Sequence, residues 1–152
     1  MAKFNKIQLA SEMFVEAHNR YTSACRDIDY ITSILLSGAV VGIISPLLKE
    51  QGGHTMHELL TRIGKLITEP GEEDTREGMF REIYNSLKHA GNKKQNIYPS
   101  KDLEIQTSLK KEAAHMLDAA KHDFLGIEVL PQVREGLSKE FLSLLEADTD
   151  YA

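Results

Sequence analysis

Residues 31–48 carry no charged side chain, and this run constrains the fold more than any other feature of the sequence. It is long enough for a membrane-spanning helix, and Gly38 and Gly42 have the spacing found in membrane helix pairs. However, its large aliphatic side chains lie opposite a small side formed by Gly38, Gly42 and Ser45. That asymmetry suits a bundle core with one close neighbour. We expect a buried central helix, with a membrane span as the alternative.

The segment before this run also has a helical pattern. Residues 1–37 contain no glycine or proline, and apolar side chains recur at steps of three and four from Ile7 to Ile31. The polar stretch 22–27 leaves two alternatives open, one long helix or two helices. Small alanines in this seam favour packing within a bundle over a dimeric coiled coil. Cys25 lies in the seam and is expected to be buried.

Turn and cap residues divide the rest of the chain. Thr55 and Glu58 form a capping-box pattern at the start of a helix whose apolar residues form one face. Further helices are expected from Asp74 to Gly91, from Pro99 to about Leu125, and from Pro131 to Leu144. The sequence therefore predicts an all-α fold: a single bundle of five to six helices over residues 1–147, with a long N-terminal helix or helix pair. Residues 148–152 are expected to be a frayed tail.

The clearest candidate binding site lies on the helix expected around residue 80. At 100° per residue, one face is apolar and another carries four polar side chains, namely Arg81, Asn85, Lys88 and His89. Lys93 and Lys94 extend this polar face into the following loop. Arginine and lysine attract phosphate, asparagine can hydrogen-bond a base edge, and histidine can transfer protons near neutral pH. The pattern predicts RNA or nucleotide phosphate as the ligand, with a solvated helix face as the alternative.

Two segments of the chain together resemble the HEPN superfamily of small helical bundles. They are a buried helix that ends in Leu47-Leu48 before Gly52-Gly53 and a helix start at His57, and then Arg81 followed by His89. The similarity in helix order extends over about residues 24–125. Members are commonly nucleotide-binding partners or metal-independent RNases in toxin and phage-defence systems, so the resemblance implies one of these functions.

The resemblance also implies roles for particular residues. Arg81 would hold the scissile phosphate, Glu82 would occupy the polar position after it, and His89 would be the acid or base at the ribose 2′-hydroxyl. The family pattern separates its arginine and histidine by four to six residues, whereas seven residues separate Arg81 from His89. An inactive, binding-only member therefore fits the sequence as well as an RNase does.

The other histidines and acidic residues predict no metal and no cofactor. A Glu-x-x-His unit ends at His115, but di-iron bundles need two such units. His115, Asp118 and His122 are instead expected to form a solvent-facing polar edge. His54 and His57 have no evident third ligand for zinc.

Charge and cysteine content complete the functional expectations. The chain has a net charge of −5 and one cysteine, and its N-terminus has no secretory signal pattern, so we expect a cytoplasmic protein. We also expect a homodimer that does not associate with membranes. The favoured function is binding of RNA or a nucleotide, with or without RNA cleavage. The alternative is a non-enzymatic interaction or regulatory protein that binds a protein partner.

Overall fold

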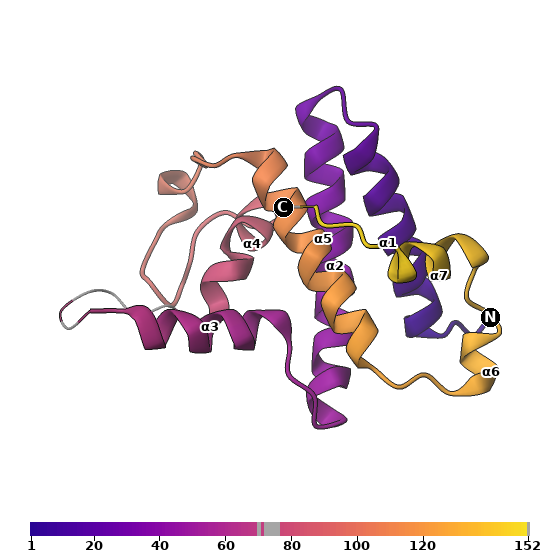
Figure 1. The fold of residues 1–152 in the computed structure, drawn as a ribbon. Helices are drawn as coiled ribbons and strands as arrows, with labels where there is room; N and C mark the ends of the chain where they lie inside the picture. Colours follow the sequence, from indigo (N-terminus) through magenta and orange to yellow (C-terminus); the bar gives the residue numbers. More distant parts are fainter. Residues whose placement is uncertain (70, 72–76, 152) are drawn as a thin grey trace.

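The computed structural model describes residues 1–69, 71 and 77–151. Within these residues the chain is all-α, with seven α-helices, two short 3-10 helices and no strand. Helices α1 (Lys6–Thr22) and α2 (Asp27–Glu50) form the N-terminal pair, and both pack against α5 (Leu109–Gly126) (Figure 1). The sequence left open one long N-terminal helix or two helices, and the turn at residues 23–26 shows that there are two.

The shorter elements lie on either side of these three helices (Figure 1). On one side are α3 (Met56–Ile67), the 3-10 helix η1 (Glu77–Arg81), α4 (Glu82–Lys88) and the 3-10 turn η2 (Pro99–Lys101). On the other side are α6 (Pro131–Arg134) and α7 (Lys139–Glu146). The capping box at the start of α3 is confirmed, because Thr55 Oγ1 accepts from Glu58 N at 3.1 Å and Glu58 Oε2 accepts from Thr55 N at 3.2 Å.

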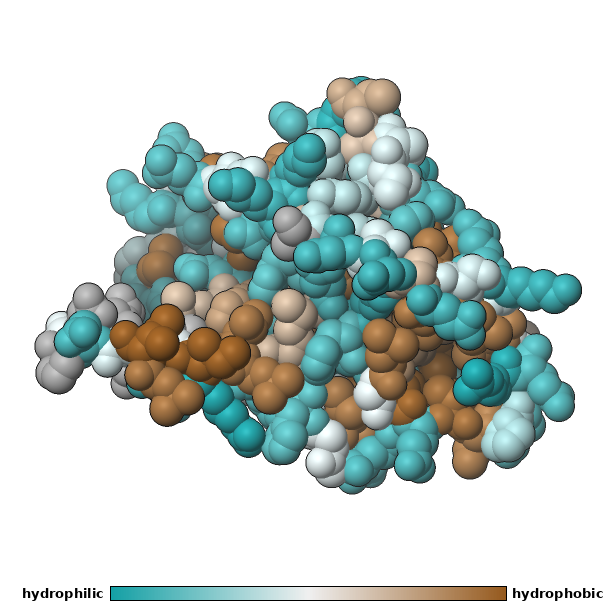
Figure 2. All heavy atoms as spheres, viewed as in Figure 1, coloured by the Kyte–Doolittle hydropathy of each residue, from teal (hydrophilic) through white to brown (hydrophobic). Residues whose placement is uncertain are grey.

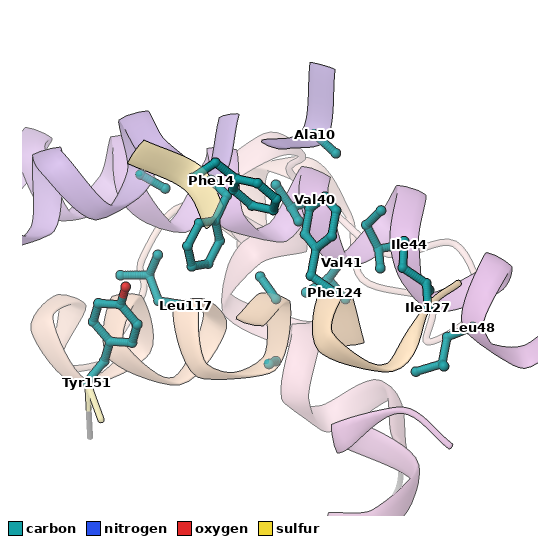
Figure 3. Close-up of a cluster of buried hydrophobic side chains, with 14 of the residues drawn as sticks. Ala10, Phe14, Val40, Val41, Ile44, Leu48, Leu117, Phe124, Ile127 and Tyr151 are labelled. Atoms are coloured by element: carbon teal, nitrogen blue, oxygen red, sulfur yellow. The ribbon is translucent and has the colours of Figure 1, made fainter. Parts of the chain in front are cut away.

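The main apolar core lies between α1, α2, α5 and α7 (Figure 3). Ala10, Phe14 and Ala17 of α1 are fully buried, which confirms the seam predicted for this helix. Phe141 of α7 closes the core, with its ring centroid 5.9 Å from Phe14 and 4.8 Å from Phe124, both in edge-to-face geometry. Such aromatic pairs add to the stabilisation from area burial.

Helix α2 is the apolar helix expected from residues 31–48. It packs against α1, α5 and α4, and eight of its residues are buried. It is also the one helix in the described part of the chain that is long and apolar enough to cross a membrane, and 44% of its most apolar window is buried.

The small side of α2 receives α4, as the sequence predicted for a close neighbour. A Cβ atom on Gly38 would lie 2.2 Å from Cδ2 of Tyr84, so the absence of a side chain lets the Tyr84 ring pack directly on the α2 backbone. A Cβ on Gly42 would meet only the guanidinium of Arg81, with Nη2 at 3.5 Å and Nη1 at 3.8 Å, both ordinary contact distances. Gly38 is therefore the position that admits α4.

We expect Gly38→Ala to lower the free energy of unfolding by about 1–3 kcal/mol, because the added methyl must displace a buried ring. Gly42→Ala is the matched control in the same helix and should change stability by less than about 1 kcal/mol. Urea unfolding of the two variants measures the difference. Equal losses would show that α4 does not approach α2 at Gly38.

Several predicted boundaries were wrong. The expected helix over 99–125 begins only at Leu109, because Ser108 caps it and accepts from Lys111 N at 3.4 Å. The expected last helix is divided into α6 and α7, with Gly136 and the cap Ser138 between them. Cys25 is exposed, because it lies in the turn between α1 and α2. The expected helix start at Asp74 lies outside the described residues, and the helix containing Asn85 ends at Lys88 rather than Gly91.

The C-terminal segment is held against the body at Tyr151, where the sequence predicted a frayed tail. Tyr151 is 8% exposed, and its hydroxyl lies 2.7 Å from Nδ1 of His18. Its backbone carbonyl accepts from the Tyr21 hydroxyl at 3.2 Å, and its N–H donates to Oδ1 of Asp118 at 3.1 Å. Tyr151 therefore joins α1 to α5.

A buried lysine strengthens this attachment. Lys121 Nζ, on a residue that is 8% exposed, donates to the carbonyl oxygens of Ala147 at 2.5 Å and Thr149 at 3.2 Å. A buried ammonium needs such acceptors, because its transfer out of water is otherwise unfavourable. The tail thus satisfies the charge that α5 buries.

Burial, with a smaller effect from the Asp118 carboxylate, raises the pKa of Tyr151 to about 12. The folded state then holds the phenol proton more tightly than the unfolded state, so the stability contributed by Tyr151 falls as pH rises from about 10 towards 12. Ultraviolet difference titration should show one tyrosine that ionises at a higher pH than the others, and this ionisation should be absent in Tyr151→Phe. A late ionisation that persists in the variant would contradict this assignment.

Candidate functional site

A hollow of about 780 Å³ lies between α4 and the loop that follows it, and we call it the loop hollow. Its lining comes from η1, from α4 and from residues 89–102. Four of the six residues predicted to bind or act on a ligand line it: Asn85, His89, Lys93 and Lys94. These four predicted residues therefore share one concave surface.

A tight turn gives the loop its shape. Asn92 N donates to Ile97 O at 2.8 Å and Ile97 N donates to Asn92 O at 2.9 Å. Gly91 and Asn96 have φ of 81° and 55°, the left-handed region that glycine and asparagine tolerate best. Asp102 Oδ2 then accepts from Gly91 N at 2.7 Å, which joins the two ends of the loop. The turn thereby positions Lys93 and Lys94 at the hollow.

The polar groups of the loop hollow are open to a ligand. Five of its side chains make no hydrogen bond or ion pair in the described part of the chain: Asn85, His89, Lys93, Lys94 and Gln95. Two carboxylates, Glu82 and Asp102, also line it. The hollow therefore offers amides, an imidazole and two ammonium groups, with a total charge close to zero.

Arg81 lies elsewhere, in a second hollow of about 320 Å³ that we call the α2 hollow. Its lining residues are Val41, Ser45, Thr55, His57, Gly78 and Arg81. Nη2 of Arg81 donates to Gly38 O at 3.1 Å, and Nε is buried without a hydrogen-bond partner. No carboxylate in the described residues forms an ion pair with this guanidinium; Asp123 accepts from Ser45, which lines the same hollow.

Tyr84 explains why two predicted ligand residues do not line the loop hollow. The guanidinium carbon of Arg81 lies 4.8 Å from the Tyr84 ring centroid and Nζ of Lys88 lies 3.9 Å from it, both at cation–π distance. The prediction that these residues share one polar face required one continuous α-helix through Arg81. The 3-10 helix η1 ends there, and its turn of 120° per residue changes the direction of the Arg81 side chain. Arg81 and His89 consequently do not meet in one hollow.

The sequence did not anticipate that His57 and His115 would meet. Their Nε2 atoms are 3.1 Å apart, and their rings and that of Phe80 are mutually stacked with centroids 5.2–5.6 Å apart. One neutral imidazole donates and the other accepts across this contact. His115 therefore packs against α3 and η1, and the expected solvent-facing edge is wrong for this residue. The sequence carries no local signal for this contact, because the two histidines are 58 residues apart in the chain.

Asp123 is a second feature that the sequence analysis missed. This carboxylate is 1% exposed, and it accepts from the Ser45 hydroxyl, from Met56 N at 2.9 Å and from His122 Nδ1 at 3.0 Å. It therefore joins α5 to α2 and to the first residue of α3. A signal for its burial was present, because Asp123 lies seven residues after buried Met116 and therefore on the same side of the helix.

In the described part of the chain, no three histidine, cysteine, aspartate or glutamate side chains are arranged to hold a metal ion. His54 is exposed and lies 3.6 Å from Glu58 Oε2, whereas His57 is buried against His115. Comparison of the chain with family models, curated proteins and solved structures finds no match.

Burial lowers the pKa of His115, and the carboxylates of Glu112 and Asp118 oppose this effect. The unfolded state then takes up a proton first, so the stability contributed by the neutral ring is lost as pH falls below about 6.5. Urea unfolding at about pH 7.5 and pH 5.5 measures how much free energy of unfolding is lost at the lower pH. This loss should be smaller in His115→Gln than in the wild type. His89→Gln, in an exposed histidine outside the stack, is the control. An unchanged acid loss in His115→Gln would contradict the prediction.

Proposed function

We propose that this chain is a single helical bundle of HEPN type that binds RNA or a nucleotide phosphate in the loop hollow. One observation carries the proposal, the meeting of four predicted residues in that hollow: Asn85, His89, Lys93 and Lys94. Their side chains come from two segments, α4 and the loop after it, and in the described part of the chain they make no hydrogen bond or ion pair that a ligand would have to break.

The placement of the polar groups gives the ligand an orientation. Lys93 and Lys94 stand on the loop and attract phosphate, whereas Asn85 stands on α4 and offers an amide to a base edge. Of the two carboxylates, Asp102 is engaged with the Gly91 N–H and Glu82 lies on α4. We therefore expect phosphate at the loop and the base near α4. The near-zero total charge predicts modest, salt-sensitive affinity.

Binding has more support than cleavage. The HEPN resemblance implies that Arg81 and His89 act on the same phosphodiester. Arg81 is instead hydrogen-bonded to Gly38 O in the α2 hollow, and the two hollows share Gly78 in their linings. We therefore propose a binding module in a cytoplasmic toxin or phage-defence setting, and RNase activity is a separate outcome of the test.

The test is fluorescence anisotropy with a labelled, mixed-sequence single-stranded RNA in EDTA, between about 50 and 200 mM salt. The double variant Lys93→Ala/Lys94→Ala should weaken binding and reduce the slope of log affinity against log salt by about two, one for each lost phosphate contact. The matched control is Lys110→Ala/Lys111→Ala, an adjacent exposed lysine pair on α5 outside the hollow. Equal effects of the two double variants, or no binding at low salt, would overturn the proposal.

The same RNA, recovered after incubation, separates binding from cleavage. We expect intact RNA with the wild-type protein. Cleavage in EDTA that is lost in both Arg81→Gln and His89→Ala would establish a metal-independent RNase, with the two residues acting together despite their separation. Circular dichroism of Arg81→Gln shows whether that variant keeps its helices.

The protein-partner function that the sequence left as an alternative is favoured by a different observation. Helix α3 exposes large apolar side chains that no described element covers. This surface is independent of the loop hollow.

A further inference from the structure

Four side chains on two helices hold residues 147–151, which we call the tail. They are His18 and Tyr21 of α1 and Asp118 and Lys121 of α5, and together we call them the tail site. Figure 1 shows the tail crossing α5 after it leaves α7, and Figure 2 shows a mainly hydrophilic surface there. The tail has no helix or strand, and residues 147–150 are exposed. Only Tyr151 is buried, so contacts with the tail site hold this segment in place.

Most of these contacts are made to the backbone of the tail. Lys121 Nζ donates to two carbonyl oxygens, those of the residues four and two positions before Tyr151. Asp118 Oδ1 accepts from the N–H of Tyr151, and the Tyr21 hydroxyl donates to its carbonyl oxygen. Every residue other than proline supplies these backbone groups, and main-chain hydrogen bonds of this kind give affinity in other peptide-binding proteins. The tail site therefore binds a peptide backbone with little dependence on its sequence.

The tail site recognises one side chain, the tyrosine. The ring centroid of Tyr151 lies 5.7 Å from those of His18 and Tyr21, and both contacts have edge-to-face geometry. Its hydroxyl lies 2.7 Å from His18 Nδ1. A phenylalanine would fill the same space but would leave this partly buried nitrogen without its partner, which is unfavourable. A tyrosine at this position is therefore the sequence requirement of the tail site.

The tail site needs an occupant, because Lys121 is 8% exposed and a buried ammonium needs acceptors. The core does not depend on the tail in the same way. The ring of Phe141 on α7 packs against Phe14 and Phe124, so α7 is fixed before the tail begins. A different peptide that supplies the same two carbonyls and a tyrosine at the same spacing satisfies the same groups.

We propose that the tail site is a peptide-recognition site, with the tail as its intramolecular ligand. Its second ligand is a segment of a partner protein that carries a tyrosine and binds in the same backbone conformation in place of the tail. Because the tail is attached to α7, it competes at an effective concentration in the millimolar range. A partner segment therefore displaces the tail only when it adds contacts of its own. No residue of the tail site lines the loop hollow, so peptide recognition is independent of RNA binding there.

The charges around the tyrosine exclude its phosphorylated form. Burial and the Asp118 carboxylate raise the pKa of Tyr151 to about 12, so the site favours a neutral phenol. A phosphate would bring about two negative charges close to that carboxylate. Lys121 is already hydrogen-bonded to two carbonyl oxygens. The ligand is therefore a peptide with an unmodified tyrosine.

Fluorescence anisotropy with a labelled peptide tests this proposal. The probe is Glu-Ala-Asp-Thr-Asp-Tyr, the sequence of residues 146–151, with an amidated C-terminus. The full-chain variant Tyr151→Ala vacates the tyrosine position, so it should bind the probe at least about tenfold more tightly than the wild type, whose own tail competes. Tyr98→Ala is the control, because Tyr98 is 76% exposed and lies outside the tail site. It should bind the probe as the wild type does.

Circular dichroism and thermal unfolding show whether Tyr151→Ala is folded. Tyr151→Phe keeps the ring but weakens the attachment of the tail, so its affinity for the probe should lie between those of the wild type and Tyr151→Ala. A folded Tyr151→Ala that binds the probe no more tightly than the wild type, or not at all at about 1 mM, would overturn the proposal.

The assigned contacts have their own test in the Tyr151→Ala variant. A probe with phenylalanine in place of tyrosine should bind about 2–10-fold more weakly, and a phosphotyrosine probe more weakly again. Adding Lys121→Gln should lower the affinity for the probe by about tenfold or more, because a charged donor to two carbonyls is lost. Lys111→Gln, at an exposed lysine of the same helix, is the matched control. Equal affinity for the tyrosine and phenylalanine probes, or equal effects of the two lysine variants, would refute these contacts.

Discussion

The carboxylate of Asp123, on α5, joins that helix to both α2 and α3 through hydrogen bonds. It is almost fully buried, so its oxygens must be satisfied inside the protein. Its partners are the Ser45 hydroxyl on α2, the first amide of α3 and the neighbouring His122 ring. A carboxylate at a helix N-terminus also benefits from the helix dipole. Asp123 therefore fixes where α3 leaves the body, and the position of α3 determines where η1 and α4 can lie.

The two hollows follow from a second constraint, the bare backbone of α2 at Gly38. Because the Tyr84 ring occupies that space, α4 packs on α2 and its two neighbouring cations, Arg81 and Lys88, take positions over the ring. Arg81 then points into the α2 hollow, while Asn85 and His89 face the loop hollow. Tyr84 thus holds Arg81 and Lys88 apart from the lining of the loop hollow, where Asn85 and His89 lie, although a helical wheel places all four side chains on one face.

Local signals in the sequence predicted local structure well. The capping box of Thr55 and Glu58 and the buried seam at Phe14 are confirmed, because each depends on residues a few positions apart. Four residues that line the loop hollow were also predicted together, because they lie in one short segment of the chain, residues 85–94. Helical periodicity carries a signal for the burial of Asp123 but none for its partners Met56 and Ser45, which lie 67 and 78 residues away in the chain. Periodicity also identified the apolar side of α3, but periodicity cannot say which side of a helix meets the body.

The attachment of Tyr151 has a consequence for how the molecule opens. Its contact with His18 joins residues 133 positions apart, so forming it closes one of the longest loops in the chain. Because Phe141 of α7 stays packed against Phe14 of α1, release of Tyr151 recovers only the conformational entropy of the short segment after α7, while the helices keep their own hydrogen bonds. The segment after α7 therefore has its own local opening equilibrium. Each opening exposes the Lys121 ammonium to water without unfolding the core.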